Sequence, residues 1–569
     1  MHNYILISLL FVFIYFNNEM QDSASPAATN PAKDVKAGVA SKKYDIRVDK
    51  YYDFSDPKTE RTDLEEFYNN RNNKLIWFNY GKYYDLNENG RELLLALEKA
   101  DDEGLNRDYY HFDKLKSDIE RGGAEKDSAL YSLAQLDVSL TQSYLDYARD
   151  IATGRIHPRH LNVNWEIFPD TFTFHKHLEK AVGRKEIAQS LKNLRPEHQQ
   201  YDLLLQALKD LKEKKASGEW PVPGTISSIA KNDSTPEVVL VKKRLAASGY
   251  LPKQDSAYIN SGMYDEKLVT AVKMFQRYHG LEIDGVVGPG TLAEMNKTVD
   301  FRIKQVRLNL DRWRWLPNVI GERDIIVNIP GFKLEYYENN KLKQEMKVVV
   351  GKTVHYTPAL KDTITYLVFN PTWNVPYSIA TEEMLPKIKA DTSFLSRNNY
   401  KLLKGSYDSD QVVNPNSIDW SKITPDNFPF FIVERPGNGN SLGRVKFMLP
   451  NNHSIYLHDT PADHLFNRKE RAFSHGCVRL EKPFQLAETL LKGQITPHEI
   501  DRMLDSFETQ TVVLDNPVAV HIVYQTVWVD DFGELNYRKD IYGFDRMSFS
   551  LLEKSEEIAP KEIDTVQNN

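Results

Sequence analysis

Apolar residues recur every three or four positions through the first part of the chain. The clearest run is residues 131–158, where the apolar positions include Leu133, Leu136, Leu140, Tyr144 and Tyr147. This spacing places them on one stripe of an amphipathic helix, and Gly154 and Pro158 mark its end. Residues 91–105 have a similar period. We therefore predict that residues 44–215 form a helical scaffold.

A second helical region follows residues 214–224, where Lys, Gly and Pro break the helical period. Residues 238–251 and 264–296 predict two or three short helices separated by turns. Their core candidates are Leu240, Leu245, Val269, Val272, Phe275 and Leu292. Nothing in this spacing alone requires a ligand. A further helix is predicted at 301–317, because Pro317 stops the period there.

From residue 324 the period of the apolar residues changes to two. The runs that alternate or are continuously apolar are 324–338, 341–351, 364–376, 429–435, 443–450 and 453–460. Gly, Pro and Asn bound these runs, which is typical of strands. A polar insert between Pro376 and Pro429 begins helically, and residues 518–541 predict a hairpin that turns near 531–533. The chain is thus predicted to be an α+β multidomain protein with a mostly-β part.

Composition narrows the class of protein. A chain of 569 residues predicts two to four packed units, and 41% hydrophobic residues are ordinary for a globular protein. The net charge of −7 gives no basic footprint, so we expect no nucleic-acid partner. An apolar run from Tyr4 to Phe16 is shorter than the roughly 20 residues of a spanning helix. Residues 1–21 are therefore predicted to be a signal peptide or an uncleaved membrane anchor, and residues 22–43 a linker.

Cys477 is the only cysteine of the chain. An exported protein meets an oxidising compartment that penalises stray thiols, so a retained one is either buried and inert or reactive. It lies in the polar stretch SHGCVR, where Gly476 permits a close backbone approach and its amide can aim at a substrate oxygen. If this stretch is extended, His475 and Cys477 project to the same side. His458, at the end of a strand whose face it shares with Tyr456, is a second candidate base.

The stretches YLHDTP and RAFSHGCVRLEKP together resemble the active-site signature of the L,D-transpeptidases, a His followed after a loop by Ser/Thr-His-Gly-Cys. The order of scaffold, binding module, catalytic domain and hairpin is similar to the large, YcbB-like branch of that family. Further segments that carry this likeness are 370–376 and 435–451. Segments similar to a peptidoglycan-binding module are 249–251, 271–276, 280–285 and 288–292.

This resemblance implies a role for each site residue. Cys477 matches the nucleophile, His458 the general acid/base, and the backbone carbonyl of Asp459 the group that orients His458. His475 and Gly476 would shape the site, with amides around Gly476 and Cys477 as oxyanion donors. The substrate-binding residues are then Ser474, Tyr456 and Arg479. Many family members have Asn where Arg479 stands, but the large branch also uses Arg, and its planar fork suits a carboxylate.

The resemblance also divides the chain. The implied units are a scaffold at 44–215, a peptidoglycan-binding-like domain at 233–297, a connecting helix at 301–317, a catalytic domain at 324–511 with a capping insert at 378–427, a C-terminal hairpin at 512–545, and a charged tail at 546–569. A capping insert of this kind acts as a lid that excludes water from an acyl intermediate.

The activity implied is cysteine-dependent acyl transfer on peptidoglycan stem tetrapeptides, which releases D-Ala and forms 3–3 cross-links without metal or organic cofactor. Trimming by an L,D-carboxypeptidase and lipoprotein anchoring would use the same site. The partners would be stem peptides and glycan in the periplasm or cell envelope, with membrane attachment through the N-terminal segment as an option. Two rivals stay open: a non-catalytic wall-binding protein, and a zinc hydrolase with ligands among His453, His458, His464, His475 and Cys477.

Overall fold

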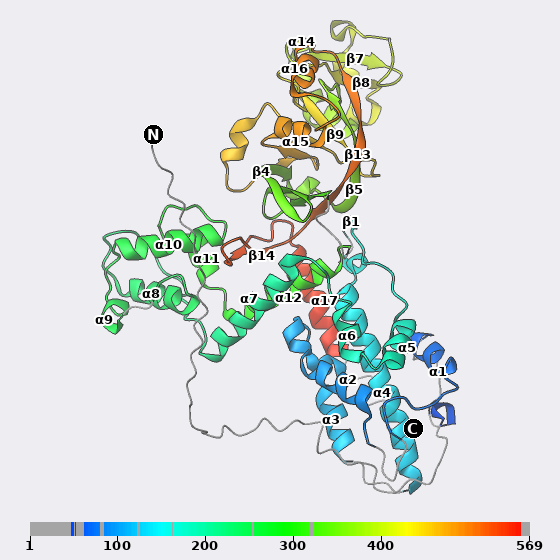
Figure 1. Ribbon diagram of the computed structural model, residues 1–569. Coiled ribbons are helices and arrows are strands. Elements are labelled where there is room, and N and C mark those ends of the chain that lie inside the picture. The colour runs from blue at the N-terminus through cyan, green and yellow to red at the C-terminus, as the bar shows by residue number, and fades with distance from the viewer. Residues whose placement is uncertain are drawn as a thin grey trace, which may run out of the picture.

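The computed structural model describes residues 47–50, 52, 62–79, 85–121, 126–161, 163–252, 255–317 and 323–558. Three lobes meet at a central helix, α12 (Val299–Arg314): a β-rich lobe at the top, a small helical lobe at the left and a larger helical lobe at the lower right (Figure 1). This arrangement confirms the predicted α+β multidomain fold. The apolar run 4–16 lies outside the described residues, and within them no helix is long and apolar enough to cross a membrane.

The larger helical lobe lies within the range predicted as a scaffold, residues 44–215. Its helices are α1 (Thr62–Asn69), α2 (Glu88–Glu98), α3 (Phe112–Arg121), α4 (Lys126–Thr153), α5 (Phe174–Arg184) and α6 (Ile187–Lys192). Helix α7 (Gln199–Ala216) instead packs beside α12 at the centre (Figure 1). The apolar stripe predicted for α4 packs into the lobe core. Gly154 ends α4 with φ of 78°, and a Cβ there would lie 2.8 Å from the Trp315 indole nitrogen. Both the backbone angle and the packing therefore require glycine at this position.

One buried carboxylate of α4 ties the scaffold together. Asp137 is fully buried, and it accepts hydrogen bonds from the Tyr68 hydroxyl at 2.6 Å and from the amides of Ile76 and Trp77 at 2.9 and 3.0 Å. Burial raises the pKa of Asp137 to about 7, although these hydrogen bonds act in the opposite direction. The side chain thus satisfies three donors from buried residues.

Asp137→Ala is expected to lower the free energy of unfolding by about 3 kcal/mol, because it strands three buried donors. Urea unfolding followed by circular dichroism measures the change. Asp118→Ala is the matched control, since Asp118 makes an exposed ion pair with Arg121 at 2.8 Å on the lobe surface. Such a pair is worth about 0.5 kcal/mol or less. Equal losses in the two variants would contradict the role given to Asp137.

The small helical lobe contains α8 (Pro236–Ser248), α9 (Ser256–Ile259), α10 (Glu266–Tyr278) and α11 (Pro289–Met295). Its core contains the predicted apolar residues except Leu240, which is 39% exposed. Leu240 lies two positions after buried Val238 and so falls on the opposite face of α8. The lobe docks on the β-rich part through buried His279, whose ring stacks on Phe275 at 3.7 Å and on Tyr537 at 5.1 Å.

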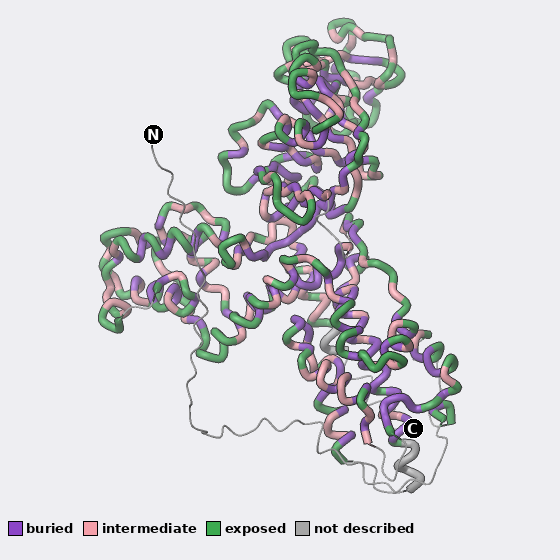
Figure 2. The backbone as a smooth tube through the Cα atoms, viewed as in Figure 1, coloured by how far each residue is buried: buried purple, intermediate pink, exposed green. Residues whose placement is uncertain are grey.

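Helix α12 joins the lobes through buried arginines. Arg312 donates to the Asp545 carboxylate at 2.6 Å, far along the chain. Arg314 donates to the Tyr201 hydroxyl at 2.9 Å and to the Glu103 carbonyl at 2.6 Å, both in the scaffold. Figure 2 shows buried chain running through each lobe and through this junction. Hydrogen bonds from two buried arginines therefore fix α12 to the scaffold and to the C-terminal part of the chain.

The β-rich lobe is built on a ten-stranded sheet with the order β1-β5-β13-β2-β3-β4-β12-β10-β9, with β11 paired to β4. Strand β9 also pairs with β5, so the sheet closes on itself. The strands are β1 (Trp165–Glu166), β2 (Arg323–Asn328), β3 (Lys333–Glu338), β4 (Lys341–Gly351), β5 (Ala359–Phe369), β9 (Val445–Met448), β10 (Leu457–His458), β11 (Ala472–Ser474), β12 (Val478–Leu480) and β13 (Gln510–Val523). Helices α15 (Pro483–Leu490) and α16 (Pro497–Asp505) follow β12.

The insert forms a separate lobe, here the capping lobe, residues 373–434. It contains a three-stranded sheet of β6 (Trp373–Asn374), β8 (Phe430–Glu434) and β7 (Tyr400–Lys404), a π-helix η7 (Ile379–Met384), and helices α13 (Leu385–Ala390) and α14 (Ser393–Arg397). Its buried apolar residues form a hydrophobic core that is separate from the core of the main sheet. The lobe therefore extends beyond the predicted limits of 378–427, because the strands on both sides pair with each other.

Two C-terminal predictions need correction. Residues 518–523 belong to β13, a main-sheet strand between β5 and β2, and the hairpin is confined to β14 (Val527–Val529) and β15 (Leu535–Tyr537). The predicted charged tail begins as helix α17 (Phe544–Ile558). Buried Asp545 pairs with Arg312 of α12, so this helix is fixed to the junction.

Candidate active site

Five polar side chains share one face of three adjacent strands. His458 on β10 stands opposite Lys446 on β9 and Arg479 on β12. Tyr456 and Cys477 lie two residues before His458 and Arg479, and side chains alternate along a strand. The Tyr456 hydroxyl and main chain both interact with the Cys477 thiol. The register therefore brings an imidazole, a phenol, a thiol and two cations together.

The loop that carries the thiol, residues 474–477 or the nucleophile loop, is bent and internally hydrogen-bonded. Gly476 has φ of 122°, a region that favours glycine. The Ser474 hydroxyl accepts from the Gly476 amide at 3.1 Å and donates to the Cys477 carbonyl at 2.6 Å. Ser474 is only 2% exposed. The hydroxyl is therefore engaged within the loop, and its predicted substrate-binding role stays a prediction.

Cys477 is half-buried, and its thiol donates to the Ser454 carbonyl at 3.6 Å. Burial raises the pKa of this thiol, while hydrogen bonds from Tyr456 and the charges of Lys446 and Arg479 act to lower it. Burial prevails, so the resting group is the neutral thiol. Ionisation then requires a base at the moment of attack.

His458 is buried on the same face as this thiol and is held by the next residue. Its Nδ1 lies 2.5 Å from the Asp459 carbonyl oxygen. A carbonyl only accepts, so Nδ1 carries the proton and Nε2 is the basic nitrogen. The Asp459 carboxylate turns away and accepts from the amides of Arg444 and Thr460, each at 2.7 Å. Burial, then Arg479 and Lys446, lower the pKa of His458 to about 3, so the ring is neutral.

His475 points elsewhere. The bend at Gly476 means that residues 475–477 are not extended, so the condition for His475 and Cys477 to share a side is not met. The His475 Nε2 lies 2.6 Å from Glu383 of the capping lobe, and its ring is 5.2 Å from that of His355. The structure thus separates the two candidate bases, with His458 in the row of Cys477 and His475 at the capping lobe.

Comparison with known proteins identifies this part of the chain. Residues 322–500 match the family model described as "L,D-transpeptidase catalytic domain". Residues 322–500 form an L,D-transpeptidase catalytic domain. Residues 234–295 match the model described as "Putative peptidoglycan binding domain", and residues 62–208 match the model described as "Scaffold domain". The chain therefore contains both the L,D-transpeptidase catalytic domain and the peptidoglycan-binding module that its sequence resembles.

Curated relatives agree over part of their length. A Haemophilus influenzae protein named "Putative L,D-transpeptidase" is 39% identical over 246 residues, which are 43% of this chain and 48% of the relative. The N-acetylmuramoyl-L-alanine amidase CwlL of Bacillus licheniformis is 26% identical over 182 residues, 30% of this chain and 41% of that protein. The chain thus spans about half the length, or less, of these curated relatives.

Two solved L,D-transpeptidase structures are also similar at low identity. The one from Mycobacterium smegmatis is 14% identical with a TM-score of 0.16, and covers 35% of this chain and 58% of that one. The one from Enterococcus faecium is a variant, 14% identical with a TM-score of 0.15, and covers 36% of this chain and 51% of that one.

Lys446 is the residue of the L,D-transpeptidase domain that the sequence did not single out. Its ammonium lies 3.8 Å from the centre of the Tyr456 ring, which in turn meets the His458 ring edge-on at 5.6 Å. Sequence alternation places Lys446 on a strand, but only the register with His458 brings it to the site. Arg479 flanks the other side, and in the described part of the chain its buried Nε has no hydrogen-bond partner.

Lys446→Met is expected to raise the pKa of the Cys477 thiol further, since the ammonium favours the thiolate. Alkylation by iodoacetamide reads this directly, because the chain has a single cysteine. The rate at pH 7 should fall at least about threefold, and its pH midpoint should move upward. Lys446→Arg keeps the charge and serves as control. An unchanged midpoint in Lys446→Met would show that the ammonium does not act on the thiol.

The zinc-hydrolase reading finds no matching arrangement of ligands. His453 Nε2 lies 2.7 Å from Glu166, His475 meets Glu383, and His458 uses Nδ1 on a carbonyl. Over the described ranges, no three His, Cys, Asp or Glu side chains gather in a way that could hold a metal ion. The proposed ligand set is therefore dispersed among separate contacts.

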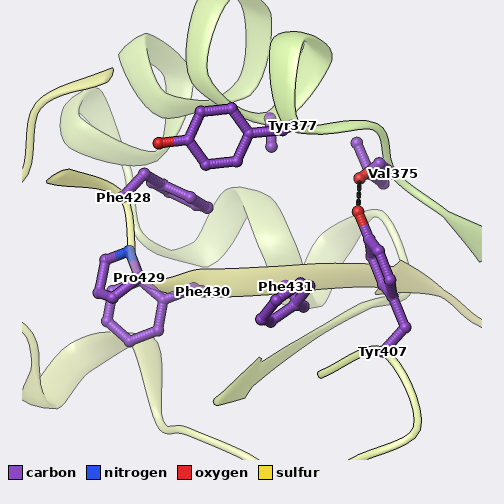
Figure 3. A pocket seen from close by; sticks show the side chains of 8 residues that line it. Val375, Tyr377, Tyr407, Phe428, Pro429, Phe430 and Phe431 are labelled. Atoms are coloured by element: carbon purple, nitrogen blue, oxygen red, sulfur yellow. Dashed lines mark hydrogen bonds between the residues drawn. The ribbon is translucent and has the colours of Figure 1, made fainter. Parts of the chain in front are cut away.

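A cavity of about 300 Å³ opens within the capping lobe (Figure 3). Its lining residues are Val375, Tyr377, Ala380, Tyr407, Phe428, Pro429, Phe430 and Phe431. Figure 3 shows the Tyr377 ring above Phe428, and the Tyr407 hydroxyl donating to the Val375 carbonyl. No charged side chain lines it, so the cavity is distinct from the polar row of the catalytic domain.

Proposed function

We propose that the chain is an L,D-transpeptidase that cross-links peptidoglycan stem peptides in the cell envelope, with Cys477 as nucleophile and His458 as general acid/base. The observation that supports this most is the row on β9, β10 and β12, where the single thiol and a neutral imidazole share one face inside the matched domain. A neutral thiol beside a neutral imidazole is a competent pair for acyl transfer.

In the first half-reaction the Cys477 sulfur attacks the carbonyl carbon between the third and fourth residues of a stem tetrapeptide. His458 takes the thiol proton, and an amide donor holds the developing oxyanion. The Gly476 amide is engaged by Ser474, so we assign this role to the Cys477 amide. The C–N bond then breaks, His458 returns the proton to the amine, D-Ala leaves, and a thioester remains.

In the second half-reaction an amine on another stem attacks the thioester carbon. His458 takes the amine proton and delivers it to the departing sulfur, which restores the thiol and leaves a new amide. An acceptor amine on the third residue gives a 3–3 cross-link. Water in its place gives a trimmed tripeptide, and a lipoprotein amine gives an anchored protein.

The remaining residues of the row fit substrate binding. Arg479 carries a buried guanidinium nitrogen without a protein acceptor in the described residues, which suits a stem carboxylate. Tyr456 presents its hydroxyl at the thiol and its ring to Lys446. The small lobe would bind wall glycan, as its matched family model implies. Export would rest on residues 1–21, as a signal peptide or a membrane anchor.

The decisive experiment incubates the purified chain with disaccharide-tetrapeptides of defined composition and analyses the products by mass. Dimers that lack one D-Ala support cross-linking. Monomeric tripeptides alone would replace it by L,D-carboxypeptidase activity on the same site. No product at all, with full binding to isolated wall, would support the non-catalytic alternative. Turnover that survives strong chelators and is lost on thiol alkylation separates the proposal from a zinc hydrolase.

A further inference from the structure

One carboxylate of the capping lobe reaches the nucleophile loop. Glu383 lies in η7 and accepts from His475 Nε2 at 2.6 Å. The Lys352 ammonium, from the end of β4, lies 3.8 Å from the same oxygen. The other face of the contact is closed by His355, whose ring is 5.2 Å from that of His475. Two groups of the catalytic domain, His475 and Lys352, thus converge on one side chain of the capping lobe.

The charge state of Glu383 suits this contact. Burial would raise its pKa, but the hydrogen bond to His475 and the charges of His475, Lys352 and Lys387 outweigh burial, and the pKa is lowered. Glu383 is therefore an ionised acceptor in the neutral range, and a hydrogen bond to an ionised group is stronger than one between neutral groups.

Glu383 lies on the exposed side of the π-helix η7. Ala380, Thr381 and Met384 of η7 are buried, while Glu382 and Glu383 are exposed residues on its surface. Single-turn π-helical segments occur often at functional sites. Glu382 and Glu383 thus lie on the same element and are both exposed, but among the described residues only Glu383 contacts the nucleophile loop.

We propose that Glu383 is a positioning residue, which holds His475 from the capping lobe and thereby sets the bend of the nucleophile loop that presents Cys477. The inference rests on the proposed role of Cys477. His475 immediately precedes Gly476, where the backbone has φ of 122°, so a pull on His475 acts on the bend itself. Seating of the capping lobe and alignment of the sulfur are then one event.

The test compares Glu383→Gln with Glu382→Gln in the full chain. Glutamine keeps the size of the side chain and removes its charge, so both variants should fold. We expect kcat for D-Ala release to fall about tenfold in Glu383→Gln with KM changed less than about twofold, since one charge-assisted hydrogen bond is lost. Glu382→Gln should match the parent. Equal kcat values in the two variants, or a higher kcat in Glu383→Gln, would overturn the proposal.

A double-mutant cycle tests the partner. His475→Gln and the double variant Glu383→Gln/His475→Gln should lose about the same kcat as Glu383→Gln alone, because each removes the same contact. Losses that multiply would mean that the two residues act independently, and the positioning role would be wrong.

Two readouts need no turnover. Amide hydrogen exchange should speed up about tenfold in residues 379–390 and 474–477 of Glu383→Gln, and iodoacetamide should alkylate Cys477 at a changed rate. Neither should change in Glu382→Gln. If the parent chain makes no product, the proposed function fails while these measurements still decide whether Glu383 holds the loop. Unchanged exchange in both segments would reject the contact.

Discussion

Cys477→Ala is expected to abolish stem-peptide turnover, with a loss of about ten-thousandfold or more in kcat. The reason is chemical, because the described row offers no second nucleophile that could form the thioester. Mass analysis of released D-Ala and of cross-linked product measures the loss. Intact-protein mass spectrometry should also detect a tripeptidyl thioester on the parent chain and none on the variant.

The single cysteine makes this experiment clean. Any thiol reagent that stops turnover acts at residue 477, since no other thiol is present. Binding to isolated peptidoglycan is the control, because the small lobe lies apart from the row and should keep its affinity in Cys477→Ala. Turnover that persists in this variant would reject the proposed enzyme and revive the wall-binding protein.

Local patterns predicted the elements well where the apolar period is long. The apolar stripe on α4 and the alternating run at 341–351 form the expected helix and strand. In both segments the period of the apolar residues is visible among neighbours in the sequence. The C-terminal part was harder. β13 continues past the predicted hairpin start because it pairs with both β2 and β5, and neither partner is visible in its own sequence.

The start of α17 has the same explanation. Residues 546–558 read as a charged tail, but Asp545 forms a buried pair with Arg312, more than two hundred residues earlier. A local pattern cannot reveal a partner at that distance. The sequence of α12 likewise predicts only an ordinary helix. The burial of its arginines depends on acceptors in the scaffold and the C-terminal part, which are distant in the sequence.

The candidate site divides in the same way. The motif around Cys477 singled out the thiol and both histidines. The residues alone left both histidines open as bases, and only the family resemblance favoured His458. A local pattern does not show the bend at Gly476 or the contact between His475 and Glu383 of a distant insert. Lys446 was missed because its place beside His458 follows from strand register, which alternation alone does not fix.

His458→Ala should lower kcat/KM for D-Ala release about a thousandfold, because the neutral thiol then has no base. His475→Ala should lose only about tenfold, since His475 acts through the loop and its contact with Glu383. Both variants are assayed on the same tetrapeptide by mass. A larger loss in His475→Ala than in His458→Ala would show that His475 is the base, and that His458 in the row on β9, β10 and β12 does not take the thiol proton.

The pH profile tests the same assignment from another side. His458 accepts the thiol proton only when neutral, and protonation below its pKa of about 3 removes that capacity. The thiol meanwhile stays protonated through the neutral range, because burial raises its pKa. kcat/KM for D-Ala release should therefore change less than about threefold between about pH 5 and 8. An acid limb near about pH 6 would mean that the imidazole titrates as in water, and that the cations and burial of the row do not govern it.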